Sequence, residues 1–227
     1  MTATTIWKSL IAFASLTAVL GNVGLTQAAF AGSGGDEIVI VAYGDSLTAG
    51  YQLPPEAAFP VQLEKALRAK GYDVRVINSG VSGDTAADGL ARFDWAMPGK
   101  ADAVILELGA NDALRGIPVA QTKAALGKIL SRLKKRRIDV LIAGMEAPRN
   151  WGDAYVEEFR AMYRSLAERY GALLYPFFLQ GIALDSSLNL ADGLHPNPQG
   201  VARIVEAILP DVEKLIGQVK ARRSHAS

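Results

Sequence analysis

The stretch Ile38–Ser46, IVIVAYGDS, decides how the rest of the chain is interpreted. Its apolar residues lead directly into a Gly44–Asp45 turn, a pattern typical of a strand buried on both faces of a parallel sheet. The residue after such a turn lies at the carboxyl edge of the strand, where open α/β sheets bind their ligands. Ser46 holds this position and is a candidate nucleophile. The alternative is that Ser46 only caps the helix whose pattern follows, as serine often does.

Apolar runs alternate with segments of helical periodicity from residue 36 onward. This alternation predicts a parallel sheet with helices on both faces, a three-layer α/β/α arrangement. Because crossover connections are right-handed, the simplest topology for five strands is the order 2-1-3-4-5. The last helix is expected to be capped by Asn197 and to begin with Pro198. The expected strands are 37–43, 74–77, 103–108, 140–143 and 172–175.

Composition limits the possible classes of protein. The chain has 227 residues, of which half are hydrophobic and 21% are charged, so we expect a single ordered domain over 36–217 and a polar tail over 218–227. The absence of cysteine excludes disulfides, thiol catalysis and cysteine-ligated zinc. A formal charge of +1 and the lack of a basic stripe beyond Lys134–Arg137 give no reason to expect a nucleic-acid partner.

The N-terminus has the pattern of a secretory signal peptide over residues 1–31. Lys8 precedes an apolar stretch of about a dozen residues, and an A-x-A-like site follows at Ala29–Ala31. Asn22 and Gln27 interrupt the apolar run short of the roughly 20 residues that a membrane span requires. Cleavage is therefore favoured over an uncleaved anchor, and no stable membrane insertion is expected afterwards. We expect a periplasmic or secreted bacterial protein.

Small and polar residues collect in four loops that are far apart along the chain. Three of these loops follow the first three strands, whose carboxyl ends are neighbours in a 2-1-3 order, and the fourth precedes the last helix. The loops are Gly44–Ser46, 78–84, Gly109–Asp112 and Asp192–Pro196. Their convergence on one edge of the sheet is stronger evidence for a site than any single motif.

A serine hydroxyl is a weak nucleophile unless a base accepts its proton. The chain has two histidines, and His225 belongs to the predicted tail, so His195 is the candidate base. Asp192 precedes His195 by three residues, near enough to bind the other ring nitrogen and to fix the tautomer. The alternative is that Asp192 only satisfies backbone groups before the last helix.

The negative charge that develops on a carbonyl oxygen needs hydrogen-bond donors. The backbone amides of Ser46 and Gly80 and the side-chain amide of Asn111 are the candidates, since glycine allows close approach of the backbone. Alternatively, Asn111 and Asp112 form an ordinary turn. Asp45 and Asp112 are expected to be structural rather than catalytic.

Taken together, the four loops resemble the sequence blocks of the SGNH (GDSL) hydrolase family. Gly44–Leu47 is similar to the GDSL block, Gly80 to the glycine of the second block, Gly109–Asp112 to the GxND block and Asp192–Pro196 to the DxxH block. All four occur in order, and the resemblance spans about 38–216. Spacing, size and leader are similar to those of the periplasmic thioesterase I/lysophospholipase L1/arylesterase group.

The resemblance implies a three-layer, flavodoxin-like α/β/α fold and hydrolysis of carboxylic esters or thioesters without a metal or cofactor. The resemblance also implies that Ser46 forms the acyl-enzyme, that His195 is the base and that Asp192 orients the base. The implied oxyanion hole consists of Ser46, Gly80 and Asn111. The expected partner is a small molecule: an aryl or short-to-medium acyl ester, an acyl-CoA or a lysophospholipid. No G-x-S-x-G elbow occurs, so the ordinary α/β-hydrolase pattern is not met.

Other functions remain open at this level. An acyltransferase or a carbohydrate O-deacetylase would use the same site, because each passes through an acyl-enzyme. A metal site for phosphoester hydrolysis, built from Asp45, Asp112, Asp192 and His195, is disfavoured because the D-x-D spacing is missing. A non-catalytic carbohydrate- or lipid-binding module is disfavoured by the complete set of candidate catalytic groups. No oligomeric state is predicted.

Overall fold

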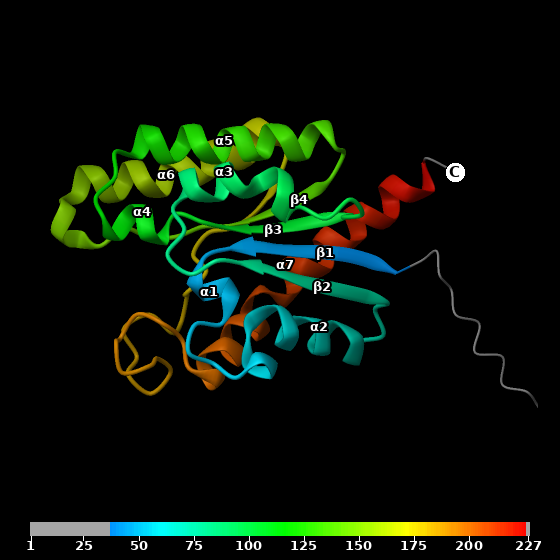
Figure 1. The fold of residues 1–227 in the computed structure, drawn as a ribbon, viewed down its shortest axis with the longest axis horizontal. Helices are drawn as coiled ribbons and strands as arrows, with labels where there is room; N and C mark the ends of the chain where they lie inside the picture. The colour runs from blue at the N-terminus through cyan, green and yellow to red at the C-terminus, as the bar shows by residue number, and fades with distance from the viewer. Residues whose placement is uncertain (1–36, 226–227) are drawn as a thin grey trace, which may run out of the picture. The chain divides into compact units, whose positions relative to one another are not determined.

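The computed structural model describes residues 37–225, all within one compact unit. The predicted signal peptide at 1–31 lies outside the described residues. Five strands form one parallel sheet in the order β2-β1-β3-β4-β5, as predicted (Figure 1). The strands are β1 (Ile38–Gly44), β2 (Val74–Gly80), β3 (Ala103–Glu107), β4 (Asp139–Ala143) and β5 (Leu173–Tyr175).

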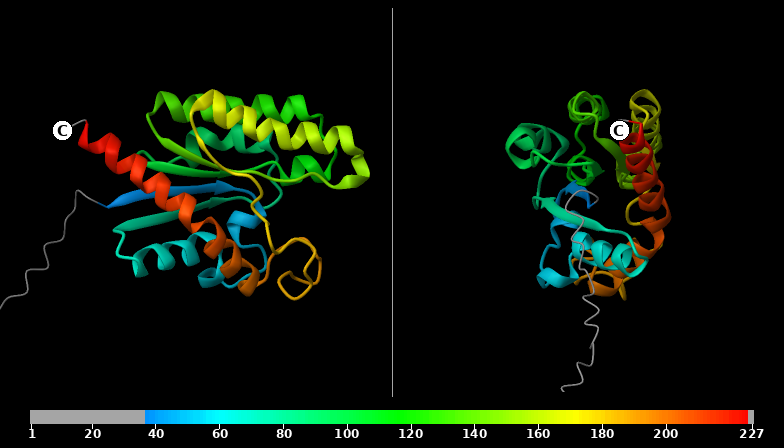
Figure 2. Two further views of the ribbon diagram at one scale, coloured as in Figure 1. Left: turned by 180° about the vertical axis from the view of Figure 1, so that it is seen from behind. Right: turned by 90° about the vertical axis from the view of Figure 1, so that its right-hand side faces the viewer.

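Helices cover both faces of the sheet. Helices α2 and α7 pack together on one face, and α3, α5 and α6 pack side by side on the other (Figures 1 and 2). The chain therefore has the predicted three layers. The helices are α1 (Ser46–Ala49), α2 (Phe59–Ala69), α3 (Ala86–Ala96), α4 (Ala110–Leu114), α5 (Val119–Lys135), α6 (Asp153–Tyr170) and α7 (Pro198–Ser224), with short 3₁₀ turns η1 (Pro55–Ala57) and η2 (Arg149–Trp151).

Strand β1 lies at the centre of the core, between β2 and β3. Every one of its residues is buried, because helices cover the sheet above and below. Removing a Val or Ile side chain from water stabilises a fold by about 1.5–3 kcal/mol, so this short apolar run contributes strongly to stability. The same burial fixes where β1 ends, and hence where the turn that follows it lies.

Side-chain caps hold the starts of two helices, and the first of them agrees with its prediction. Asn197 caps α7 by accepting from the amides of Gln199 and Gly200, and Pro198 is the first helical residue. Thr85 caps α3 in a capping box with Asp88. The loops before these two helices are thus held at the carboxyl edge of the sheet.

The predicted polar tail over 218–227 needs a correction, because α7 continues to Ser224. Its apolar face extends to Val219, which is fully buried. Arg222 Nε donates to Asp139 Oδ2 over 2.9 Å, and Arg223 Nη2 lies 2.8 Å from Asp102 Oδ2. These cations are held by carboxylates at the amino ends of β3 and β4. No helix within residues 37–225 has the length and apolar character needed to span a bilayer.

Candidate active site

Ser46 is the first residue of α1, directly after the turn that ends β1. Asp45 is fully buried and caps this helix, with its Oδ1 accepting from the amide of Leu47 over 3.0 Å. Only glycine fits before it, since a Cβ on Gly44 would lie 2.1 Å from Thr48 Oγ1 and 2.5 Å from the carbonyl oxygen of Glu107. The turn therefore presents the half-buried Ser46 side chain at the sheet edge.

The predicted nucleophile and base meet although 149 residues separate them. His195 Nε2 lies 2.9 Å from Ser46 Oγ, and His195 Nδ1 lies 2.7 Å from Asp192 Oδ2. If Nδ1 donates its proton to the carboxylate, Nε2 is left as an acceptor for the serine hydroxyl. The three side chains thus form a continuous hydrogen-bonded line.

Asp192 is held by the loop that precedes α7. Its Oδ1 accepts from the amides of Leu194 over 2.9 Å and His195 over 3.0 Å. These backbone bonds are the main cause that lowers the pKa of Asp192 to about 2, and the His195 side chain lowers it further. Asp192 is therefore a carboxylate at neutral pH, suited to hold the proton on the Nδ1 of His195.

Gly80 ends β2, directly opposite Gly44 in the register of β1 and β2. A Cβ there would lie 2.3 Å from the amide nitrogen of Ala49, so only glycine lets β2 approach α1 this closely. Its own amide, however, donates to Asn78 Oδ1 over 3.0 Å. The predicted oxyanion donor lies beside the nucleophile turn but is bonded to a neighbouring side chain.

Asn111 lies in α4, a short helix where the sequence also allowed an ordinary turn. Its Nδ2 donates to Asp45 Oδ2 over 3.2 Å and to the carbonyl of Asp84 over 3.0 Å. Its amide therefore faces the nucleophile turn, and both of its protons have acceptors within the protein. The third predicted donor, the amide of Ser46, belongs to the first turn of α1, where amides have no partner inside the helix.

A buried carboxyl group beneath the turn was not identified from the sequence. Glu107 is fully buried at the end of β3, where its Oε2 accepts from the Thr48 hydroxyl over 2.8 Å and from the Asp45 amide over 3.3 Å. Burial, and then the charge of Asp45, raise the pKa of Glu107 well above its usual range. Burial also raises the pKa of Asp45 to about 6. Burial thus favours the protonated form of both carboxyl groups, and more strongly that of Glu107.

Arg92 in α3 also contacts the turn that ends β1. Its Nη2 donates to the carbonyl of Gly44 over 2.9 Å, its Nε pairs with Asp84, and its guanidinium lies 4.1 Å from the ring centroid of Tyr43. The side chain is only 6% exposed. The sequence contains little indication of the roles of Arg92 and Glu107. The one signal was that each is a charged residue within an expected helix or strand.

Asp112 has the structural role that was expected. Its Oδ2 accepts from the amide of Ala86 and its Oδ1 from the Thr122 hydroxyl, each over 2.8 Å. It therefore joins α3, α4 and α5 and does not approach His195. Across residues 37–225, no group of three or more His, Asp or Glu side chains is arranged to hold a metal ion.

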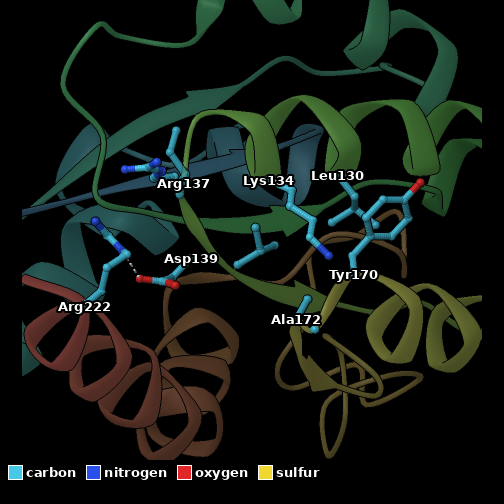
Figure 3. Close-up of a pocket in the computed structure, with 10 residues that line it drawn as sticks. Leu130, Lys134, Arg137, Asp139, Tyr170, Ala172 and Arg222 are labelled. Carbon is cyan, nitrogen blue, oxygen red and sulfur yellow. Dashed lines mark hydrogen bonds and ion pairs between the residues drawn. The ribbon is translucent and has the colours of Figure 1, made fainter. Parts of the chain in front are cut away.

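A separate cavity of about 160 Å³ lies at the amino end of β4, away from the turns described above. Figure 3 shows Arg222 paired with Asp139 beside it, and Lys134, Arg137 and Tyr170 on its walls. Because it lies where α5, α6 and α7 end, its cations compensate the negative ends of these helices. It contains none of the predicted site residues.

A parallel α/β/α sheet with a hydrogen-bonded Ser–His–Asp array at its carboxyl edge defines the class of three-layer serine hydrolases. Within that class, residues 42–203 match the model of the GDSL-like lipase/acylhydrolase family. The chain belongs to this family and is an acylhydrolase of the SGNH type.

Three relatives illustrate the similarity. The arylesterase of Vibrio mimicus is 39% identical over 176 residues, which cover 77% of this chain and 88% of the relative. The thioesterase 1/protease 1/lysophospholipase L1 of Escherichia coli K12 is 34% identical over 188 residues, covering 82% and 88%. The crystal structure of AlinE4, an SGNH-hydrolase family esterase, is 45% identical with a TM-score of 0.67, covering 79% of this chain and 97% of that one.

Proposed function

We propose that this protein is a secreted serine esterase that hydrolyses carboxylic esters or thioesters through an acyl-enzyme on Ser46. The observation that carries the proposal is the pair of contacts made by His195, 2.9 Å to Ser46 Oγ and 2.7 Å to Asp192 Oδ2. The first lies within the distance over which a general base accepts the proton of a nucleophile, and the second within the distance of a hydrogen bond that orients the base.

In the first half of the reaction, Ser46 Oγ attacks the carbonyl carbon of the substrate while His195 Nε2 accepts the hydroxyl proton. The carbonyl electron pair moves onto the oxygen and gives a tetrahedral oxyanion. When the carbonyl re-forms, the bond to the alcohol or thiol breaks, and the leaving group takes the proton from Nε2. Water then attacks the acyl-enzyme in the same way, releasing the acid and restoring Ser46.

The charge of Asp192 stabilises the imidazolium that exists between these two proton transfers. Because its pKa is lowered to about 2 by the amides of His195 and Leu194, it remains an acceptor at neutral pH. The backbone bonds also hold the carboxylate in place, so that Oδ2 stays directed at Nδ1.

The oxyanion would be received by the amides of Ser46 and Gly80 and by Asn111 Nδ2. Two of these donors must exchange an acceptor: Gly80 leaves Asn78, and Asn111 leaves Asp45, its longer contact at 3.2 Å. A full negative charge competes well for the Gly80 amide, because its present acceptor, Asn78 Oδ1, is neutral and hydrogen bonds to charged groups are about twice as strong as neutral ones. Catalytic hydrogen bonds commonly tighten only when substrate is bound.

The proposed substrates are aryl or short-to-medium acyl esters, acyl-CoA thioesters and lysophospholipids. The arylesterase and thioesterase/lysophospholipase names of the relatives support these classes. An acyltransferase or a carbohydrate O-deacetylase would use the same groups. Product analysis with and without an added alcohol acceptor separates transfer from hydrolysis, because transfer converts acceptor into a new ester.

The decisive test is labelling by a fluorophosphonate together with turnover of nitrophenyl esters from acetate upward, a lysophospholipid and an acyl-CoA. We expect Ser46→Ala to abolish both labelling and turnover. The matched control is Ser186→Ala, which changes an exposed serine in the loop before α7 and should alter neither. Folded wild-type protein that is not labelled at neutral pH would contradict the proposal.

Export is tested separately. We expect the full chain, produced in a bacterium with an outer membrane, to be recovered outside the cytoplasm with an N-terminus close after Ala31. Intact mass measurement gives that position. Protein that keeps residues 1–31 and stays with the cytoplasmic fraction would contradict secretion and leave the chemistry unaffected.

A further inference from the structure

The ring of Tyr51 packs against the imidazole of His195. Their centroids are 4.5 Å apart and their planes are inclined by 40°. The two rings line a narrow crevice with Ser46, Leu53 and Pro196 that has no room for a water molecule. Asp192 and Ser46 contact the two nitrogens of the imidazole. Tyr51 instead packs against the ring itself.

The backbone around Tyr51 is bonded to the residue that carries the nucleophile. Its amide donates to the carbonyl of Ser46 over 3.1 Å, at the point where α1 ends. Gly50 ends the helix in the left-handed conformation, with φ of 83°, and a Cβ there would lie 2.7 Å from that of Ala58. Tyr51 is therefore joined to Ser46 by its backbone and to His195 by its ring.

The next residue holds the hydroxyl end of the ring. Gln52 adopts a left-handed φ of 57°, which is uncommon for a residue other than glycine. In this conformation Gln52 Nε2 donates to the Tyr51 hydroxyl over 3.1 Å. The hydroxyl end of the ring thus has a partner of its own, apart from the ring contact with His195.

Tyr51 contributes little to the hydrophobic core. It is 40% exposed, so a large part of its surface faces solvent. A tyrosine retained for stability alone would be expected to bury its ring in that core. The principal aromatic neighbour of Tyr51 is instead the candidate base.

We propose that Tyr51 is a positioning residue for His195, which holds the imidazole in line between Asp192 and Ser46 and stabilises it when it carries the transferred proton. This inference rests on the proposed function. Rotation of the imidazole about its Cβ–Cγ bond would break the contacts to Asp192 and Ser46 together, and the tyrosine ring obstructs that rotation. A protonated imidazole beside an aromatic face within about 6 Å is also attracted to it.

The kinetic test compares Tyr51→Phe, which keeps the ring, with Tyr51→Leu, which removes it. Nitrophenyl acetate and hexanoate are the substrates. We expect Tyr51→Phe to keep kcat within about twofold and Tyr51→Leu to lower kcat roughly three- to thirtyfold for both esters, with KM little changed. Trp151→Leu is the comparator, because it removes a similarly exposed aromatic ring that packs on Tyr155 at the same edge of the sheet. Its effect should fall on KM and grow with acyl length.

A spectroscopic readout separates positioning from substrate contact. The chain has only two histidines, so the ring proton resonances of His195 can be followed with His225 as an internal reference. We expect Tyr51→Leu to weaken the downfield signal of the Nδ1 proton that His195 donates to Asp192, and Tyr51→Phe to preserve it. Thermal unfolding of each variant checks that the fold is retained.

The outcomes are distinct. An undiminished Nδ1 proton signal of His195 in Tyr51→Leu, an unchanged kcat, or a loss confined to KM and dependent on acyl length would each overturn the inference. A wild-type protein that hydrolyses neither ester and is not labelled at Ser46 would contradict the proposed function itself, and the inference with it. Loss of kcat for both esters in Tyr51→Leu, with active and labelled wild type, supports it.

Discussion

The hydroxyl of Thr48 donates to Oε2 of Glu107 over 2.8 Å and so joins helix α1 to the end of β3. The same oxygen accepts from the amide of Asp45, whereas Oε1 of Glu107 has no partner among the described residues. An ionised carboxylate with an unpaired oxygen would be costly at a fully buried position. The neutral acid loses less hydration than the carboxylate at this position, so burial favours it.

We therefore expect Glu107→Gln to be close to wild type in stability at pH 5 and more stable than wild type at pH 9. The pKa of Glu107 is raised in the folded state, chiefly by burial, so its contribution to stability is present at low pH and is lost as pH rises toward the folded pKa. The loss amounts to at most about 1.4 kcal/mol for each pH unit above the unfolded value. Urea unfolding between pH 5 and 9 measures it, and parallel curves would contradict a neutral Glu107.

Asp192→Asn should lower kcat by about 10⁴-fold, the effect seen when a triad carboxylate becomes an amide. An asparagine amide directed at Nδ1 favours the tautomer whose proton is on Nε2, which cannot accept from Ser46. Because the lowered pKa keeps Asp192 ionised above about pH 4, the defect should persist across pH 5 to 9. Steady-state kinetics over that range check this. A defect that disappears at either end would contradict the assigned role.

Asn111→Ala and Asn78→Ala test the oxyanion donors, and the two substitutions should change kcat in opposite directions. Removing one such donor typically costs about 10²–10³ in kcat, and we expect this of Asn111→Ala. Asn78→Ala removes the acceptor that now holds the Gly80 amide, so kcat should rise by about two- to tenfold, the equivalent of one net hydrogen bond. An Asn111→Ala enzyme with unchanged kcat, or a loss of kcat in Asn78→Ala, would remove support for these donors.

Arg92→Ala should destabilise the fold by about 3–5 kcal/mol, because it leaves the buried Asp84 without its partner. Arg132→Ala is the matched control, since Arg132 pairs with Asp94 on the surface, where both side chains are more than one-third exposed. The control should change the free energy of unfolding by at most about 1 kcal/mol. Equal effects of the two substitutions would contradict the structural role of Arg92 beneath the nucleophile turn.

The alternation of apolar runs was enough to predict the strands, their order and the layers, because burial on both faces leaves a strong signal in the sequence. Strand β1 was expected at 37–43 and is found at Ile38–Gly44. The polar tail predicted over 218–227 is wrong as far as Ser224, where α7 ends, with Arg222 and Arg223 meeting carboxylates at the amino ends of β4 and β3. Such contacts between distant segments have no local sequence pattern.

The meeting of Ser46, Asp192 and His195 could be predicted because topology alone brings these loop ends to one edge. The present acceptors of Gly80 and Asn111, by contrast, are set by side-chain rotamers at Asn78 and Asp45. The contact of Tyr51 with His195 depends on left-handed backbone at Gly50 and Gln52. A glycine suggests the first of these conformations, and nothing in the sequence suggests the second.

Helix α7 begins beside the histidine loop and ends at the opposite edge of the sheet, where Arg222 binds Asp139. Its 27 residues correspond to about 40 Å of helix. The C-terminal end of α7 is therefore a suitable point for attachment to a bead or a sensor surface, because an anchor there leaves the Ser46 edge facing the bulk solution. Immobilised in this way, the enzyme should retain the turnover that it has when free.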